Sequence, residues 1–358
     1  MSSRLSTTGS VTLERSTVIA AKAVLLVLLV LCAGESSLYA DDEAVQCQQV
    51  NPAVTYPAGA NSYRDVIYGA IRGYRPLTLD LYVPPSNGRV RPLVIFVHGG
   101  GWMHRTPREG GSFTDFPAVL ADVAAHGYVV ASVSYRFSYE APFPAAVRDV
   151  GMAIQWLRGC AKEYLIDPDS AVLWGSSAGA QIASLIGAAC DVEALQPPRD
   201  ESRPAISTCV NGVIDWYGPI DFENLASDLG DTADKAESNV SSLVANYLGC
   251  NLDQCAPGVA RAASPLAYID GNEPAFLIQH GEADSSVSPR QSKRLYEALR
   301  AAGVPVELQY FPKVGHGFVN VPHGGPDDAV NAKVMEKIFE FLDHYAPSAA
   351  NDQPDNAN

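Results

Sequence analysis

Short apolar segments alternate with segments of helical periodicity along most of this chain, and this alternation restricts the possible folds more than any other feature. Leu93–Val97 is a continuous apolar run, typical of a strand buried on both faces of a sheet. Phe116–Gly127 has helical spacing and ends at a glycine. The alternation predicts an α/β fold with a mainly parallel central sheet and helices on both faces. In such folds the functional residues follow the carboxyl ends of strands.

The chain of 358 residues is acidic, with a formal net charge of −15. Apolar residues make up 47% of it, which is enough for a sizeable core. The negative charge argues against nucleic acid and anionic membranes as partners. It favours neutral or cationic substrates.

The first forty residues have the pattern of a secretory signal peptide. Three basic residues precede the apolar run Ala23–Gly34, and small and polar residues follow it. We predict cleavage after Ser36 or Ala40, a secreted or periplasmic protein, and no stable membrane span in the mature chain. The apolar run is short for a spanning helix, which needs about 20 residues. An uncleaved membrane anchor is the open alternative.

Export to an oxidising compartment predicts disulfide bonds. Six cysteines lie outside the predicted leader, which itself contains Cys32. Proximity in the sequence favours two pairs and leaves a third, although four of these cysteines allow three connectivities. The favoured pairs are Cys250–Cys255, Cys190–Cys209 and Cys47–Cys160. The cysteine spacing does not resemble a zinc site, and we expect no metal.

A serine surrounded by small residues follows one of the predicted strands. Ser177 is the centre of a G-x-S-x-G pattern, between an apolar strand and a helical segment. A sharp strand-to-helix turn would expose the serine at its apex, and bulky side chains at 175 and 179 would collide with that turn. The N–H of Ala178, at the start of the helix, would face an oxyanion. We therefore predict that Ser177 is a nucleophile.

A glycine-rich loop, HGGGW at 98–102, follows the buried strand at Leu93–Val97. Three glycines allow the backbone to pass close to a reacting carbonyl with its N–H groups free. We predict that Gly100 and Gly101 form an oxyanion hole together with Ala178. His98 is expected to order the loop.

A serine nucleophile needs a base, and the base needs an acid that orients it. His316 follows a predicted strand and has a glycine on each side, so we predict that it is the base, with His323 as the alternative. Asp284 follows another strand and is the predicted acid, with Glu282 as the second choice. His280, close to Asp284 in the sequence, is expected to pack in the core.

Together these motifs resemble the α/β-hydrolase superfamily, and within it the esterases and lipases that carry HGGGW. The similarity rests on HGGGW at 98–102, GSSAG at 175–179, HGEADSSV at 280–287 and GHGF at 315–318. It extends to hormone-sensitive-lipase-like esterases and more closely to bacterial carboxylesterases of feruloyl-esterase-like and acetylxylan-esterase-like type. The resemblance implies the α/β-hydrolase fold and a triad of Ser177, Asp284 and His316. Ser176 and Ala180 depart from the G-D-S-A-G-G pattern of the hormone-sensitive-lipase branch.

We divide the chain on this basis. Residues 41–63 form an N-terminal extension, residues 64–346 the catalytic domain, and residues 347–358 a disordered tail. An insert at 222–272 could form a small lid. Such a lid would shape the acyl pocket, so the choice of substrate stays open. Within that insert, Asn239 begins a glycosylation sequon.

The predicted activity is hydrolysis of small or carbohydrate-linked carboxylic esters through an acyl-enzyme, without metal or organic cofactor. Trp102, Trp216 and Tyr217 are candidates for binding the substrate, and a structural role in the core is the alternative for each. A prolyl-oligopeptidase-like peptidase and an arylformamidase-like amidase are the competing enzymatic interpretations. A non-catalytic binding protein is the alternative outside enzymes, but such proteins usually lack a triad member.

Overall fold

One sheet organises the part of the chain that the computed structural model describes, namely residue 47 and residues 54–199, 205–229, 233–321 and 324–348. Its strands are β1 (Val54–Thr55), β2 (Asn61–Gly69), β3 (Leu77–Val83), β4 (Arg91–Val97), β5 (Val129–Val133), β6 (Ile166–Ser176), β7 (Gly212–Trp216), β8 (Ala275–Gly281) and β9 (Val306–Phe311). The α-helices are α2 (Phe116–Ala125), α3 (Ala145–Gly159), α4 (Ala161–Tyr164), α5 (Ala178–Ala189), α6 (Leu225–Leu229), α7 (Ala233–Leu248), α8 (Val259–Ala263), α9 (Pro289–Ala301) and α10 (Asp328–Tyr345).

The strands are arranged in the order β1-β2-β3-β5-β4-β6-β7-β8-β9. From β5 through β4 to β9 every neighbouring pair is parallel, whereas β1, β2 and β3 extend the sheet in antiparallel fashion. The prediction of a mainly parallel α/β sheet is therefore confirmed. Parallel neighbours place the ends of β6, β7, β8 and β9 at one edge, where the predicted functional loops begin.

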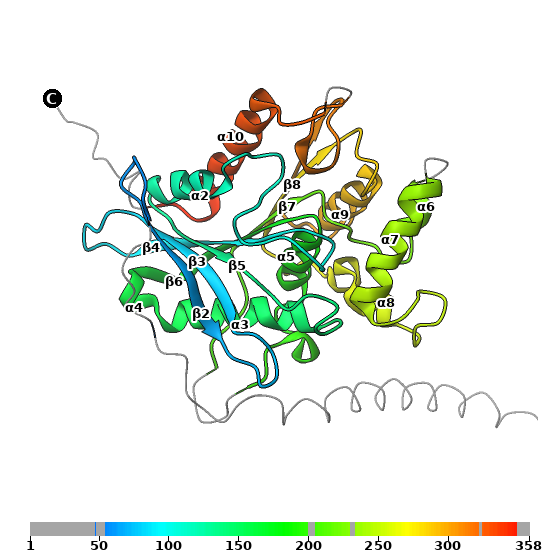
Figure 1. The fold of residues 1–358 in the computed structure, drawn as a ribbon, viewed down its shortest axis with the longest axis horizontal. Helices are drawn as coiled ribbons and strands as arrows, with labels where there is room; N and C mark the ends of the chain where they lie inside the picture. The colour runs from blue at the N-terminus through cyan, green and yellow to red at the C-terminus, as the bar shows by residue number, and fades with distance from the viewer. Residues whose placement is uncertain (1–46, 48–53, 200–204, 230–232, 322–323, 349–358) are drawn as a thin grey trace, which may run out of the picture.

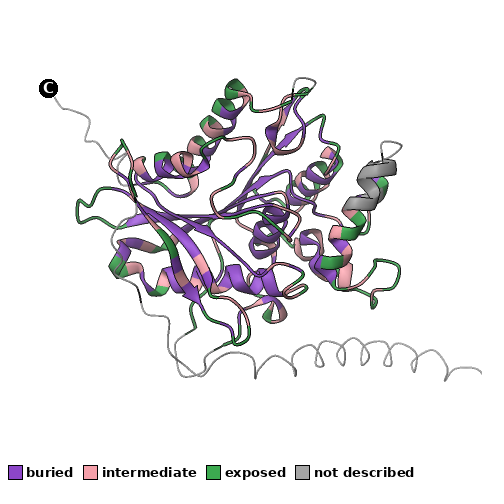
Figure 2. Cartoon of the chain, viewed as in Figure 1, coloured by how far each residue is buried: buried purple, intermediate pink, exposed green. Residues whose placement is uncertain are grey.

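Helices cover both faces of the sheet (Figure 1). On one face α2 and α10 contribute to an apolar core that also contains Val94 and Phe96 of β4. On the other face α3, α5 and α9 contribute to a core that contains Leu93 and Ile95 of the same strand. Because side chains alternate across a strand, a continuous apolar run supplies both cores. Figure 2 shows the result as a buried sheet between helices whose outer faces are exposed.

The sheet begins earlier than the sequence analysis indicates. β1 and the first residues of β2 lie within residues 41–63, the predicted N-terminal extension, and they pair with the rest of the sheet. β1 has only two residues, both exposed, so it carries no apolar pattern that marks a strand. At the other end, the Ser348 hydroxyl donates to the carbonyl of His126 at 3.1 Å, so the packed chain extends past residue 346.

Three disulfides connect segments outside the sheet, as predicted. They are Cys47–Cys160, Cys190–Cys209 and Cys250–Cys255. In the described residues we find no helix long and apolar enough to cross a bilayer. The predicted signal peptide and Cys32 lie outside the described residues, as does the side chain of Asn239.

The disulfides differ in the length of chain they close, and their contributions to stability should differ accordingly. The Cys47–Cys160 bond joins residues 113 apart, whereas the Cys250–Cys255 bond joins residues 5 apart. Loss of loop-closure entropy in the unfolded chain corresponds to about 5 kcal/mol for the long loop and about 2 kcal/mol for the short one. We expect Cys→Ser substitution of the first pair to lower the free energy of unfolding, measured by urea titration, more than substitution of the second. Equal losses would contradict this account.

Candidate active site

The chain turns sharply at Ser177, directly between β6 and α5. Ser177 has φ 54° and ψ −119°, a conformation that L-residues rarely adopt and that costs about 1–3 kcal/mol. A side chain on Gly175 would overlap the backbone of Gly179, and one on Gly179 would overlap the carbonyl of Val97. The two glycines are therefore required by close backbone contacts, and the turn leaves the serine hydroxyl half-buried above the sheet edge.

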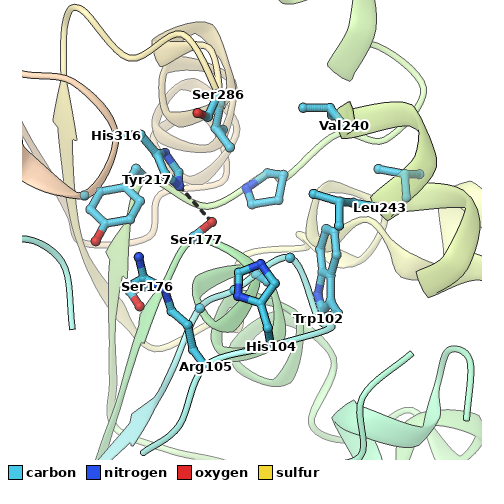
Figure 3. Close-up of a pocket in the computed structure, with 18 of the residues that line it drawn as sticks. Trp102, His104, Arg105, Ser176, Ser177, Tyr217, Val240, Leu243, Ser286 and His316 are labelled. Carbon is cyan, nitrogen blue, oxygen red and sulfur yellow. Dashed lines mark hydrogen bonds between the residues drawn. The ribbon is translucent and has the colours of Figure 1, made fainter. Parts of the chain in front are cut away.

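Three loops that follow β6, β8 and β9 bring the predicted serine, acid and base together. The Ser177 Oγ lies 3.0 Å from Nε2 of His316. The other ring nitrogen of His316, Nδ1, lies 2.7 Å from Oδ2 of Asp284. Figure 3 shows the His316 ring directed at the serine hydroxyl across the pocket. This is the geometry by which an imidazole accepts a proton from a serine while a carboxylate fixes its tautomer.

The Asp284 carboxylate is held by four hydrogen bonds. Its Oδ1 accepts from the backbone N–H groups of Ser286 and Val287 at 2.8 and 2.9 Å. Its Oδ2 faces His316 and also Nε2 of His280, at 3.2 Å. Burial alone would raise the pKa of Asp284, but the attraction of His316 and the hydrogen bonds from both histidines hold it well below the ordinary value. The carboxyl therefore stays ionised.

His280 belongs to this site as well as to the core. The ring is fully buried, as expected, but it also contacts the Asp284 carboxylate. Its Nδ1 lies 2.6 Å from the Ser292 hydroxyl, and its Nε2 lies 3.0 Å from the carbonyl of Val287. A carbonyl only accepts, so Nε2 carries the proton and Nδ1 accepts from the serine. The spacing of four residues between His280 and Asp284 is the signal in the sequence for this contact, and it does not by itself distinguish a partner of the acid from a core residue.

The glycine loop packs against the serine turn. A side chain on Gly99 would meet the carbonyl of Ser176 at 2.7 Å. In the described part of the chain, the N–H groups of Gly100, Gly101 and Ala178 have no hydrogen-bond partner, and all three residues line the pocket. The N–H of Ser177, in contrast, is bonded to the carbonyl of Trp216 at 2.8 Å. Three free donors are thus gathered beside the serine.

The loop is supported from behind by His98 and a tyrosine. His98 is fully buried, and its ring stacks on Tyr135 with centroids 4.6 Å apart. The Tyr135 hydroxyl donates to the carbonyl of His98 at 2.9 Å. Burial chiefly lowers the pKa of His98 to about 4, so its ring stays neutral. These contacts agree with the expected loop-ordering role.

A cavity of about 220 Å³ opens above the serine. Trp102 and Tyr217 line it, as the sequence analysis suggests. The Trp102 ring stacks on Tyr247 at 4.4 Å, and the Tyr217 ring meets His316 edge-on at 4.8 Å. Apolar side chains from the predicted insert complete one wall, namely Leu225, Val240, Leu243 and Val244.

Trp216 does not line this cavity, and its placement corrects the proposed substrate-binding role. The side chain is fully buried beneath the sheet edge, where it packs against Trp174 at 4.7 Å. Its indole N–H donates to Gln279 at 2.7 Å. Tyr217, the residue that follows β7, packs beside the Trp216 ring with centroids 6.4 Å apart, but it also lines the cavity. Of the alternative site residues, Glu282 is exposed and has no contact with His316, and His323 lies outside the described residues.

Comparison with known proteins agrees with this fold. The family model BD-FAE matches residues 79–299. The chain belongs to the BD-FAE family. The match covers the strands β4 to β8 and both the glycine loop and the serine turn.

Several proteins that are similar to this chain in sequence or structure are named as esterases. The chain is 30% identical to esterase LipQ of Mycobacterium tuberculosis over 71% of its own length and 56% of that relative, so it spans little more than half of LipQ. Est2, a thermophilic esterase of the planctomycete Thermogutta terrifontis, superimposes with a TM-score of 0.63 and 25% identity, over 83% of this chain and 95% of Est2. A carbohydrate esterase from gut microbiota shares the fold, with a TM-score of 0.65 and 22% identity over 83% and 99% of the two chains.

The lowered pKa of Asp284 makes stability depend on pH. The unfolded chain protonates this carboxyl at its ordinary pKa of about 3.9, whereas the folded protein keeps it ionised. Its contribution to stability is therefore complete above that pH and is lost as the pH falls through it toward the folded-state pKa. We expect the free energy of unfolding to fall more steeply below pH 4 in the wild type than in Asp284→Asn. Urea titrations at several pH values test this, and parallel slopes would refute it.

Proposed function

We propose that this protein is a secreted serine carboxylesterase that hydrolyses small or carbohydrate-linked esters through an acyl-enzyme. The observation that carries the proposal is the continuous chain of hydrogen bonds from Asp284 through His316 to Ser177, with distances of 2.7 and 3.0 Å, beside three free backbone donors. Each component has a defined role in acyl transfer.

In the first step Ser177 Oγ attacks the ester carbonyl carbon while His316 Nε2 accepts the hydroxyl proton. The carbonyl oxygen becomes an oxyanion and receives hydrogen bonds from the N–H groups of Gly100, Gly101 and Ala178. Asp284 stabilises the imidazolium that forms. The oxyanion then collapses, the alcohol leaves with the proton from His316, and the acyl group stays on Ser177.

In the second step a water molecule replaces the alcohol. His316 takes a proton from this water, which attacks the acyl carbon, and the same donors hold the second oxyanion. Collapse releases the carboxylic acid and returns the proton to Ser177. The sequence of steps uses only side chains and backbone groups of the described site.

The small volume and apolar wall of the cavity favour short acyl groups. A cavity of about 220 Å³ with Val240 and Leu243 on one side suits groups of the size of acetate to butyrate. Est2 has been crystallised with propionate and with butyrate bound, which agrees with this size class. The likeness to a carbohydrate esterase supports a sugar-linked alcohol only at the level of a shared fold.

Export is supported by two features of the chain. The first forty residues have a signal-peptide pattern, and the three disulfides suit an oxidising compartment. Residues 222–272 would act as the lid, since α6 and α7 supply the apolar wall of the cavity.

A series of 4-nitrophenyl esters tests the function. We expect acetate and butyrate to be hydrolysed with higher kcat/KM than octanoate, as the proposed preference for short acyl groups requires. Ser177→Ala should lower kcat by at least about ten-thousandfold, since the nucleophile is lost. Ser86→Ala, at an exposed serine that does not line the cavity, is the matched control and should retain full activity.

Aminoacyl-proline anilides and aryl formamides distinguish the competing peptidase and amidase activities. Faster turnover of either class than of the short esters would replace the esterase assignment. Unchanged ester turnover in Ser177→Ala would remove the proposed mechanism altogether.

His280 should act as a positioning residue for the acid. His280→Leu removes a hydrogen bond to a carboxylate, and we expect it to lower kcat about tenfold with little change in KM. His280→Gln keeps a donor and should recover part of that loss. Folding is checked by circular dichroism, and a loss that appears in KM alone would argue against positioning.

A further inference from the structure

The two sides of the cavity differ in polarity. Figure 3 shows Val240 and Leu243 of α7 on one side of Ser177. Arg105 and Ser176 lie on the opposite side of that serine. His104 lies between them at the base of the view. A substrate with one apolar and one polar end would therefore bind in one orientation.

The cavity also differs in charge from the protein as a whole. The chain carries a net charge of −15, yet no aspartate or glutamate is among the described residues that line the cavity. The carboxylate of Asp284 lies behind His316, with its side chain fully buried and hydrogen-bonded. Among the described residues that line the cavity, Arg105 is consequently the one side chain with a permanent charge. The neutral or cationic substrates favoured by net charge alone do not match this lining.

Arg105 is exposed, and it has no carboxylate partner in the described part of the chain. Other arginines near the site are paired, including Arg75 with Glu140, Arg108 with Asp80 and Arg136 with Asp149. An exposed guanidinium without a partner is free to bind a carboxylate through two parallel hydrogen bonds.

The loop that carries Arg105 is tightly folded, which fixes where it can reach. Gly100, Gly101, Trp102 and Arg105 all have positive φ, at 104°, 59°, 58° and 77°. The carbonyl of Gly100 accepts hydrogen bonds from the N–H groups of residues 103 and 104, so the chain folds back over the glycine loop. Arg105 is thereby held on the rim beside the proposed oxyanion donors.

The charge of Arg105 affects the pKa values of two neighbouring side chains. Burial raises the pKa of Tyr217, and Arg105 is the largest influence that opposes this rise. Burial lowers the pKa of His98, and Arg105 adds to that effect. Arg105 and Tyr217 both line the cavity that contains Ser177, so an anion bound at Arg105 would lie close to the reacting ester.

We propose that Arg105 selects ester substrates that carry a carboxylate, by pairing with that carboxylate while the ester lies over Ser177. The inference rests on the proposed function and narrows its substrate class. The carboxylate can belong to the acyl group, as in a dicarboxylic half-ester, or to the alcohol, as in an acylated hydroxy acid or uronic acid. Both share the same recognition chemistry.

Two pairs of esters of similar size separate these sources. Monoethyl succinate and ethyl butyrate differ in a carboxylate on the acyl side, and acetoxyacetate and ethyl acetate differ on the alcohol side. Hydrolysis is followed by pH-stat titration in the wild type, Arg105→Gln and Arg105→Lys. Arg72→Gln removes an exposed arginine that does not line the cavity, and is the matched control.

We expect one anionic ester to be preferred over its neutral counterpart in the wild type. Arg105→Gln should lower that preference about three- to tenfold, Arg105→Lys should lower it less, and Arg72→Gln should leave it unchanged. The pair that responds identifies the side of the ester that carries the charge. Added salt should weaken the preference in the wild type.

Several results would overturn the inference. An unchanged preference in Arg105→Gln excludes selection by charge, as does hydrolysis of the neutral esters without hydrolysis of either anionic ester. An equal loss for charged and neutral esters would assign Arg105 to transition-state stabilisation instead. If the wild type hydrolyses none of the four esters, the proposed function fails separately. Calorimetric binding of monoethyl succinate and acetoxyacetate to Ser177→Ala and to Ser177→Ala/Arg105→Gln then still decides the role of Arg105, since equal affinities would refute it.

Discussion

The parallel hydrogen-bond register of the central strands is the constraint on which the site depends. It pairs Ser176 of β6 with Trp216 of β7, and Trp216 with Gln279 of β8. Gly281, at the end of β8, pairs with Phe311 of β9. The loops that carry the serine, the acid and the base therefore start at one edge of the sheet. A slip by one residue would turn every side chain to the opposite face and separate them.

Close backbone packing converts this alignment into a site with usable donors. The glycine loop lies against the serine turn because Gly99 has no side chain, and Tyr135 holds it through the His98 carbonyl. The segment after β5 is itself fixed to α3 by the buried ion pair of Arg136 with Asp149, at 2.7 Å. Removal of one partner of such a pair leaves a buried charge and typically destabilises by about 3–5 kcal/mol.

The sequence was most informative where a residue type has few possible roles. Apolar runs predicted the parallel strands. Flanking glycines distinguished Ser177 and His316, whose side chains lie within hydrogen-bond distance in the structure. The sequence was not sufficient where residues of the same type, in similar sequence contexts, have different roles in the structure. Trp216 and Trp102 are both aromatic residues next to motifs, and only the direction of each side chain separates core from cavity. The exposed strand β1 has no apolar pattern by which it could be predicted. The net charge of −15 gives no indication that the cavity lining carries a positive charge at Arg105.

In this fold the residues around Ser177 and the residues of the two cavity walls come from different parts of the structure. The groups placed around Ser177 are fixed by strand ends and buried hydrogen bonds, so changing them disturbs the core. The two cavity walls come from other segments, the loop after β4 with Arg105 and the insert after β7 with Val240. Neither wall takes part in the strand ladder. Substitutions there alter the polarity and size of the cavity while the register that aligns Ser177, Asp284 and His316 is preserved.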